Sequence, residues 1–372
     1  MSGASRYADI PTPSMLVDWD VLRRNARRMA AHAARHGVNL RPHGKTHKTR
    51  EIAQLQLDEG ASGLTLARLG ELEAMLLPDL RDVLIAFPLV GADKLERLVK
   101  ISRDRRVLVS LDHLDVASGI SDAAAAAGTR VPVLLEIDTG GGRCGVLPER
   151  AAALAQATDA LPGLELAGIM THEGHAYAAE NRADLRARSL EAGTLMVQTA
   201  TRLRANGHDM RIVSVGSTPS ALDIAEVQGI TEIRPGTYVF QDFNQVRLGV
   251  ASLDDCAARV LATVVARPAP DRAVIDAGTK AVAADRHMIR AERDGYGAVV
   301  DHPGWFFARA SEEHGVLLRD EAAPSTELSV GNRVEVIPNH ICPAINLFDE
   351  LIIVRKGVIE GRIAVAARGR SR

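Results

Sequence analysis

The feature that most restricts the fold is an alternation of short apolar segments with longer segments rich in alanine and leucine. The eight short segments have a β-like composition and lie at residues 38–40, 63–66, 83–86, 107–110, 133–137, 166–171, 212–215 and 230–233. The segments between them repeat apolar residues at helical spacing, and the longest runs from residue 181 to residue 206. Strands that alternate with helices form parallel sheets, and eight such units predict a (β/α)8 barrel. A doubly wound open sheet alternates in the same way and is the alternative.

The pattern changes after about residue 250. Short β-like runs at residues 260–266, 273–276, 334–337 and 351–354 are separated by proline, glycine and aspartate, with little helical periodicity between them. This pattern predicts a smaller, mostly β domain. We therefore predict two domains in the 372 residues, a barrel over residues 20–250 and a β domain over residues 251–372.

Charge and hydropathy exclude several classes of partner. Forty-five basic and forty-seven acidic residues leave a formal net charge of -2, which gives no field to attract nucleic acid or an anionic membrane. The first residues lack the apolar core of a signal peptide, and no apolar run reaches the ~18 residues of a membrane span. Cys144, Cys256 and Cys342 are odd in number and far apart, which suits a reducing compartment. We expect a cytoplasmic protein that acts on a small molecule.

A basic segment, RPHGKTHK at residues 41–48, follows the strand predicted at residues 38–40. A lysine at the mouth of an apolar scaffold loses its proton more easily, because burial and the neighbouring cations Arg41 and Lys48 both disfavour the charged ammonium. The free amine can then form a Schiff base, so Lys45 is the candidate nucleophile. A solvated basic turn is the alternative interpretation.

Loops after later strands offer sites for anions. EIDTGGGRCG at residues 136–145 contains the pattern G-x-G-x-x-G of dinucleotide-binding folds, although that fingerprint normally follows the first strand. The alternative is that Arg143 holds an anionic oxygen of a cofactor, since the glycines allow close approach. GSTPS at residues 216–220 and RPGTY at residues 234–238 follow the seventh and eighth predicted strands, where barrels often build phosphate sites. They predict a phosphate-binding cup.

Two further segments carry residues typical of catalytic or metal-binding sites. THEGHAY at residues 171–177 gathers two imidazoles, a carboxylate and a phenol after the sixth predicted strand, and it predicts the lining of a site. In PNHICP at residues 338–343, His340 and Cys342 would lie on one face of an extended segment, and imidazole with thiolate favours zinc. A buried cysteine beside a hydrogen-bonded histidine is the alternative.

Taken in chain order, RPHGKTHK, EIDTGGGRCGV, THEGHAY, GSTPS, RPGTY and PNHICP resemble the motifs of the D-threonine aldolase and D-serine dehydratase family. These are pyridoxal-phosphate (PLP) enzymes of fold type III, with an architecture like that of alanine racemase. The resemblance runs from about residue 10 to the last residues. It implies that the barrel carries PLP and that the protein forms a homodimer. It also implies that the β domain takes in the N-terminal strand within residues 1–19 and supplies a divalent metal.

Carried over residue by residue, the resemblance implies roles for the motif residues. Lys45 would form the Schiff base with PLP, and Arg143 would lie near the phenolic oxygen of the cofactor. The residues implied to line the ring and the substrate, or to contact the phosphate, are His172, Tyr177, Ser217, Thr218, Gly236, Thr237 and Tyr238. His340 and Cys342 would be the metal ligands.

The resemblance also implies a reaction on a β-hydroxy D-amino acid, with PLP as an electron sink and the metal as a Lewis acid at the hydroxyl. If Lys45 removes the Cα proton and hydroxide leaves, the products are a 2-oxo acid and ammonia. If His172 or His175 deprotonates the hydroxyl instead, the Cα–Cβ bond breaks to give glycine and an aldehyde.

The metal pair favours the first of these reactions. Dehydratases of the family resemble this chain in carrying His-x-Cys, whereas D-threonine aldolases carry His-x-Asp, a harder pair suited to manganese. We therefore predict zinc, with manganese as the alternative, and a dehydratase that acts on D-serine or a D-3-hydroxyaspartate-like substrate.

Other features of the sequence are compatible with a different reaction or function. NLFD at residues 346–349 is aldolase-like, and Glu173 is a carboxylate expected in neither branch, so a D-threonine aldolase is the first alternative. A racemase would share the barrel and Lys45 but has no use for a metal pair. A non-catalytic PLP-binding protein normally comprises only the barrel.

Overall fold

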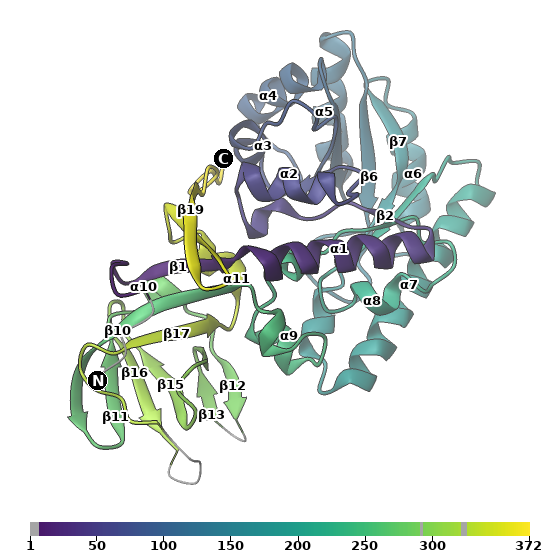
Figure 1. Ribbon diagram of the computed structural model, residues 1–372. Coiled ribbons are helices and arrows are strands. Elements are labelled where there is room, and N and C mark those ends of the chain that lie inside the picture. Colours follow the sequence, from purple (N-terminus) through teal and green to yellow (C-terminus); the bar gives the residue numbers. More distant parts are fainter. Residues whose placement is uncertain (1–6, 291–292, 321–325) are drawn as a thin grey trace. The chain divides into compact units, whose positions relative to one another are not determined.

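The structure is a computed structural model that describes residues 7–290, 293–320 and 326–372 (Figure 1). The chain divides into two compact units. The barrel unit comprises residues 26–45, 50–236 and 370–372. The β unit comprises the residues up to 25, together with 46–49 and 237–369.

Eight parallel strands form the sheet of the barrel unit, in the order β2-β9-β8-β7-β6-β5-β4-β3. Their bounds are β2 (Asn39–Leu40), β3 (Leu64–Leu66), β4 (Asp82–Ile85), β5 (Arg106–Leu111), β6 (Val131–Glu136), β7 (Leu164–Met170), β8 (Ile212–Val215) and β9 (Glu232–Ile233). The two edges also meet, because His43 bridges Thr65 and the N–H of Thr65 donates to the carbonyl of Pro42 (2.8 Å). The sheet is therefore closed. The predicted (β/α)8 barrel is confirmed, and the open doubly wound sheet is excluded.

Helices alternate with these strands as the apolar periodicity predicts. They are α1 (Trp19–His36), of which the barrel unit holds the part from residue 26, α2 (Arg50–Asp58), α3 (Leu69–Ala74), α4 (Ala92–Ser102), α5 (Leu114–Ala126), α6 (Ala151–Asp159), α7 (Arg182–Ala205) and α8 (Ala221–Ile224). The helix predicted over residues 181–206 is α7, which Asn181 caps by accepting the N–H of Asp184 (3.0 Å). Gly37, with φ +65°, ends α1 in the left-handed conformation that favours glycine.

Neighbouring strands of the barrel unit share an apolar cluster, and the segments after several strands are polar. Leu84, Leu108, Leu134, Ala167 and Met170 form one buried cluster of side chains on neighbouring strands. In a parallel barrel all strands end on the same face, and that face carries the active-site loops. The segments in which the sequence concentrates glycine, histidine and hydroxyl residues follow β2, β6, β7, β8 and β9, so the barrel brings them to this face.

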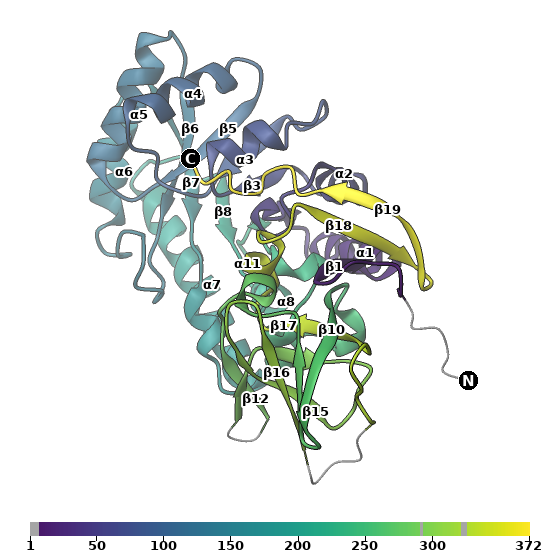
Figure 2. The same cartoon turned by 90° about the vertical axis from the view of Figure 1, so that its left-hand side faces the viewer.

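The β unit is built on a nine-stranded sheet with the main order β15-β16-β11-β10-β1-β18-β19, while β17 pairs with β10 and β14 (Figure 2). The bounds are β1 (Ser14–Asp18), β10 (Ala258–Ala269), β11 (Arg272–Ile275), β14 (Gly297–Val299), β15 (Trp305–Ala310), β16 (Gly315–Arg319), β17 (Arg333–Pro338), β18 (Glu350–Arg355) and β19 (Val358–Ala364). Strand β1 lies between β10 and β18, so the N-terminal strand is part of this sheet.

Smaller elements complete the β unit. A separate hairpin joins β12 (His287–Arg290) and β13 (Arg293–Gly295), and the short helices are α9 (Phe243–Arg247), α10 (Thr279–Val282) and α11 (Ile341–Ile345). The predicted mostly β character of this region is confirmed. Among the described residues, no helix combines the length and the apolar character that crossing a membrane requires.

Candidate active site

Lys45 lies half-buried in a 3-10 turn, η1 (Gly44–Thr46), shortly after β2. Its N–H donates to Nδ1 of His43 at 3.5 Å. Burial lowers the pKa of the His43 imidazole well below its usual value, and the positive charges of Lys45 and Arg234 lower it further. Cations gathered around a buried, neutral imidazole form a setting that an anionic ligand would stabilise.

The pKa of His172, which lies just after β7, is lowered by burial and by the same positive charges. Burial lowers the pKa of this imidazole to about 4, and Lys45, Arg143 and Arg234 contribute to the shift. Nδ1 of His172 lies 3.3 Å from the carbonyl oxygen of Gly216. A carbonyl oxygen only accepts hydrogen bonds, so Nδ1 carries the proton and Nε2 keeps its lone pair. At neutral pH His172 is an uncharged side chain with one nitrogen able to accept a proton.

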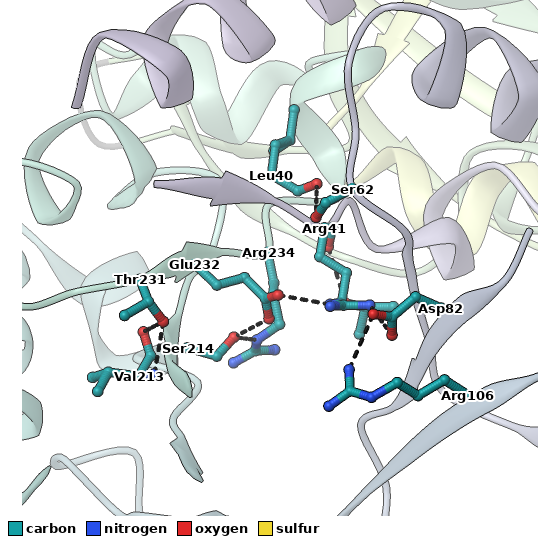
Figure 3. A network of polar contacts seen from close by, with 11 residues as sticks. Leu40, Arg41, Ser62, Asp82, Arg106, Val213, Ser214, Thr231, Glu232 and Arg234 are labelled. Carbon is teal, nitrogen blue, oxygen red and sulfur yellow. Dashed lines mark hydrogen bonds and ion pairs between the residues drawn. The ribbon is translucent and has the colours of Figure 1, made fainter. Parts of the chain in front are cut away.

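Arg234 is a central cation that lies in the RPGTY motif, although no site role is predicted for it from the sequence. The side chain is buried, and Nε donates to Oγ of Ser214 at 2.7 Å (Figure 3). Nη2 donates to the carbonyl of Thr171. Burial lowers the pKa of the Arg234 guanidinium, although Glu232 opposes the shift. An arginine that directly follows a barrel strand and precedes Pro-Gly was the signal that could have identified it.

Arg41 is held by two carboxylates of the barrel unit. Its guanidinium bonds to Glu232 (2.8 Å) and Asp82 (2.9 Å), so its charge is already compensated (Figure 3). That Arg41 disfavours the charged form of Lys45 stays a prediction. The cations of the barrel unit that act on His172 are Lys45, Arg143 and Arg234.

The turn after β8, at residues 216–220, is built around Gly216. This residue has φ +137°, and a Cβ there would lie 2.5 Å from the backbone nitrogen of Arg234. Only glycine allows the turns after β8 and β9 to approach so closely. Glu173, fully buried, accepts the N–H of Gly216 (3.2 Å) and the hydroxyl of Ser220, and Oγ of Ser217 lies 2.9 Å from Oγ of Ser220. Both carboxylate oxygens are thus engaged by the turn.

The glycine-rich loop after β6 does not form a dinucleotide site. Oδ1 of Asp138 accepts the N–H groups of Gly140 (2.9 Å), Gly141 (2.8 Å) and Gly142 (3.2 Å). These are the backbone donors that a pyrophosphate would need, so the dinucleotide interpretation is wrong. Arg143 follows with a largely exposed side chain.

His175 lies beside this loop. A Cβ on Gly140 would lie 3.6 Å from the His175 ring, so the glycine leaves room for the imidazole. Nδ1 of His175 is buried and has no hydrogen-bond partner among the described residues. A buried polar atom without a partner is typical of a site that binds a water molecule or a ligand.

The remaining predicted residues divide between the units. Tyr177 is half-buried in the 3-10 turn η2 (Gly174–Ala178), Thr218 is buried, and Gly236 ends the barrel segment. Thr237 and Tyr238 are buried in η3 (Thr237–Val239), which belongs to the β unit, as do the predicted metal ligands. The barrel unit therefore holds Lys45, Arg143, His172, His175, Tyr177, Ser217, Thr218 and Gly236, and the β unit holds Thr237, Tyr238, His340 and Cys342.

His340 and Cys342 do not lie in an extended segment, so that prediction is wrong. His340 is the extended residue before α11, and Cys342 is the second residue of this helix. The helix nevertheless keeps the pair together, since their side chains are hydrogen-bonded. Sγ of Cys342 also lies 3.2 Å from Oγ1 of Thr46 and 3.5 Å from Oγ1 of Thr237.

The electrostatics of this pair favour a thiolate. Burial alone would raise the pKa of Cys342, but His340 and the two threonine hydroxyls lower it below its usual value. For His340 burial acts to lower the pKa, and the Cys342 thiolate outweighs it and raises the pKa to about 9. Thiolate is the form of cysteine that binds metal ions. Within the described part of the chain, no group of three or more His, Cys, Asp or Glu side chains could hold a metal.

Two carboxylates support the pair. Asp242, fully buried, accepts the N–H of Ile341 (3.1 Å) through Oδ2 and the N–H of Gln245 (3.1 Å) through Oδ1. Burial raises the pKa of Asp242 to about 6, with His340 opposing. Oδ2 of Asp285 lies 3.8 Å from Nδ1 of His340. These contacts tie the metal-ligand candidates to α9 and to the segment before β12.

Comparisons with known proteins agree with this architecture. The family model described as "Alanine racemase, N-terminal domain" matches residues 17–243, and "Putative serine dehydratase domain" matches residues 257–354. A D-threonine aldolase from Arthrobacter sp is 35% identical over 98% of this chain and 94% of its own length. A D-threo-3-hydroxyaspartate dehydratase from Delftia sp. (strain HT23) is 35% identical over 90% of this chain and 91% of its own.

Solved structures give the same result. The crystal structure of a D-threonine aldolase from Filomicrobium marinum superposes with a TM-score of 0.89 at 33% identity, covering 98% of both chains. A D-threo-3-hydroxyaspartate dehydratase mutant, described as a metal-free form, gives 0.89 at 32% identity over 97% of this chain and 98% of that one. The chain therefore belongs to the D-threonine aldolase and D-serine dehydratase family, lyases with an alanine racemase-like barrel and a serine dehydratase domain.

Proposed function

We propose that this protein is a PLP- and divalent-metal-dependent lyase that acts on β-hydroxy D-amino acids, and that its main reaction is β-elimination to a 2-oxo acid and ammonia. D-serine or a D-3-hydroxyaspartate-like compound is the proposed substrate. The observation that carries this proposal is the hydrogen-bonded His340–Cys342 pair with its stabilised thiolate, because imidazole with thiolate favours zinc.

The residues of the barrel unit fit PLP. Its phosphate and phenolic oxygen are anionic, and Lys45, Arg143 and Arg234 supply positive charge around His172. When bound, PLP withdraws electrons from the substrate Cα and so acidifies the Cα–H bond. We assign the Schiff base to Lys45 and the phenolic oxygen to Arg143. The residues proposed for the ring and the phosphate are Tyr177, Ser217, Thr218, Gly236, Thr237 and Tyr238.

Proton transfers fall to side chains of the barrel unit. Lys45 Nζ is the proposed acceptor of the Cα proton. His172 is held with its Nδ1–H on the Gly216 carbonyl, so Nε2 is the atom that can take a proton from a substrate hydroxyl. With a pKa of about 4, His172 is a weak base at pH 7, which favours elimination over hydroxyl deprotonation. His175, with its unpartnered Nδ1, is the second candidate base.

The β unit fits a divalent metal. His340 and Cys342 would supply two ligands, and water or substrate oxygens would complete the coordination, as in catalytic sites that keep open positions. A metal held there supplies Lewis-acid chemistry at an oxygen atom. Zinc is the proposed metal, and manganese is the alternative.

A retro-aldol reaction is the second candidate function. The similarity to a D-threonine aldolase extends over 98% of this chain. Oδ1 of Asn346, the first residue of the aldolase-like segment, accepts a hydrogen bond from Nζ of Lys48 (2.8 Å), so this segment has a defined place in the β unit. Racemisation is a third candidate and would not need the metal pair.

The test is a product analysis with D-threonine, using zinc-loaded and manganese-loaded protein in parallel. We expect 2-oxobutanoate and ammonia. Glycine and acetaldehyde would show an aldolase instead, and would mean that cysteine at position 342 does not decide the reaction. Protein that carries PLP on Lys45 and forms neither product would refute the lyase proposal for this substrate.

A variant of the metal pair separates lyase from racemase. His340→Ala is expected to abolish lyase activity and to weaken zinc binding, measured by competition with a chromophoric chelator. Full activity in His340→Ala would support a racemase. A homodimer and a cytoplasmic location stay predictions, and sedimentation of the holoenzyme would test the first.

A further inference from the structure

Glu173 has no role in the proposed reaction, yet it is fully buried at the site. Its Oε2 accepts the N–H of Gly216 (3.2 Å), and its Oε1 accepts the hydroxyl of Ser220. Because both oxygens already accept hydrogen bonds from one turn, Glu173 is not a base for the substrate. Its contacts point to a role in the turn itself.

The hydrogen bonds of this turn converge on the carboxylate. Ser220 has one hydroxyl proton and gives it to Glu173, so its Oγ accepts from the N–H (3.2 Å) and the hydroxyl (2.9 Å) of Ser217. Glu173 therefore engages four donors, two directly and two through Ser220. While this arrangement holds, these donors are not available to an anion bound at the turn.

The carboxylate also balances nearby positive charge. It opposes the lowering of the pKa of Arg234 and of His172, which means that it stabilises the cationic forms of both. A bound phosphate would compete with Glu173 for the positive charge of Arg234 and for the same donors, and two like charges close together repel each other.

We propose that Glu173 is an internal counter-anion of the turn at residues 216–220, and that its charge lowers the affinity of this turn for the phosphate of PLP. The inference rests on the proposed function, in which the turn holds that phosphate. It gives a role to a buried carboxylate that the family resemblance did not predict at this position.

Glu173→Gln removes the charge and keeps the shape. The glutamine Oε1 can accept the N–H of Gly216, and its amide can donate to Oγ of Ser220 in place of the Ser217 hydroxyl. The Ser220 hydroxyl then turns to its other acceptor, the carbonyl of Ser217 at 3.2 Å. Glu173→Met is a second uncharged variant, which also releases the donors of the turn.

The experiment compares PLP with pyridoxal, which lacks the phosphate. Cofactor-free full-length protein is titrated with each, and binding is followed by the visible absorbance of the bound cofactor. We expect Glu173→Gln and Glu173→Met to bind PLP roughly tenfold more tightly than the wild type, with unchanged affinity for pyridoxal. Glu165→Gln is the matched control, because Glu165 makes an exposed ion pair with Arg211 near the start of β7, whereas Glu173 follows the end of that strand.

The possible results separate the two proposals. A wild-type protein that binds neither PLP nor pyridoxal would refute the proposed function. If the wild type binds PLP but uncharged variants with unchanged circular dichroism bind it equally or more weakly, only the role of Glu173 is refuted. An equal gain for pyridoxal would also overturn it, because the effect would then not involve the phosphate.

Discussion

At the residue scale, two neighbouring polar side chains, the half-buried His172 and the buried Glu173, hold one glycine of the site. His172 donates to the carbonyl of Gly216, and Glu173 accepts its N–H. The motif THEGHAY predicted that this segment lines a site, and the geometry adds which atoms are committed to the backbone. The sequence could not assign Glu173, because its partners are 43 and 47 residues away along the chain.

His172 should make the stability of the cofactor-free protein depend on pH. In the unfolded chain its imidazole takes up a proton near pH 6.5, whereas the folded protein takes it up near pH 4. Between these values the unfolded state binds more protons, so stability falls as the pH falls below 6.5. The loss at pH 5 is on the order of 2 kcal/mol.

The variant His172→Asn tests this expectation, since its amide can still donate to the Gly216 carbonyl but cannot titrate. Thermal unfolding is followed by circular dichroism at pH 7 and pH 5. We expect the midpoint to fall less for His172→Asn than for the wild type. An equal fall in both proteins would mean that His172 is not the titrating group.

At the scale of elements, α11 shows how the tertiary structure overrides a local pattern. The segment PNHICP is predicted to be extended, yet a helix begins at Ile341. Pro343 is the third residue of this helix, where its missing N–H costs no intrahelical hydrogen bond. Asp242 accepts the N–H of Ile341 from 99 residues away and so stabilises the helix start. The periodicity of the local sequence cannot predict this partner.

Asp242→Ala should therefore weaken both α11 and the metal site. The change leaves the buried N–H group of Ile341 without an acceptor and leaves the N–H of Gln245 only the backbone carbonyl of residue 242 (3.1 Å), and we expect a stability loss of roughly 2–4 kcal/mol. The zinc affinity, measured by competition with a chromophoric chelator, should fall roughly tenfold, because the residues around metal ligands orient them.

Asn181→Ala is the matched control for Asp242→Ala. Asn181 caps α7 in the barrel unit, so its loss should cost about 1 kcal/mol and leave the zinc affinity unchanged. If zinc binds Asp242→Ala as tightly as it binds the wild type, Asp242 does not position the metal ligands.

At the scale of the whole molecule, a buried ionic network crosses the strands of the barrel. Arg41 bonds to Glu232 (2.8 Å), and Glu232 accepts the hydroxyl of Ser214 (2.6 Å), which in turn accepts from Arg234 (Figure 3). A Cβ on Gly63 would lie 2.7 Å from Nη1 of Arg41, so a glycine makes room for the guanidinium. The network links the segments at the ends of β2, β9 and β8.

Breaking this network should destabilise the protein far more than breaking an exposed pair. Arg41→Met leaves Glu232 buried without its cation, and we expect a loss of about 3–5 kcal/mol. Arg106→Met removes a pair with Asp82 in which Arg106 is 41% exposed, and should cost less than about 1 kcal/mol.

Chemical denaturation of the three proteins measures these differences. The double variant Arg41→Met/Glu232→Gln should recover part of the loss, because no charge is then left unpaired. Equal destabilisation by Arg41→Met and Arg106→Met would show that the Arg41 pair is not buried in solution.

The sequence alone determined the repeating units of the barrel, the long helix at residues 181–206, four strands of the β unit and the segments that carry the candidate residues. These follow from local rules, since one buried face imposes a period on a helix and a run of apolar residues suits a buried strand. Several short strands of the β unit were missed because three to six residues carry too little pattern.

Only the tertiary structure decided which distant residues meet. The closure of the barrel at His43 and Thr65, and the pairing of Arg41 with Glu232 across 191 residues, have no local signature. The same holds for the acceptor that begins α11. Burial and hydrogen bonding are properties of the packed chain, because the free energy of a charged or polar group depends on the partners that surround it after folding.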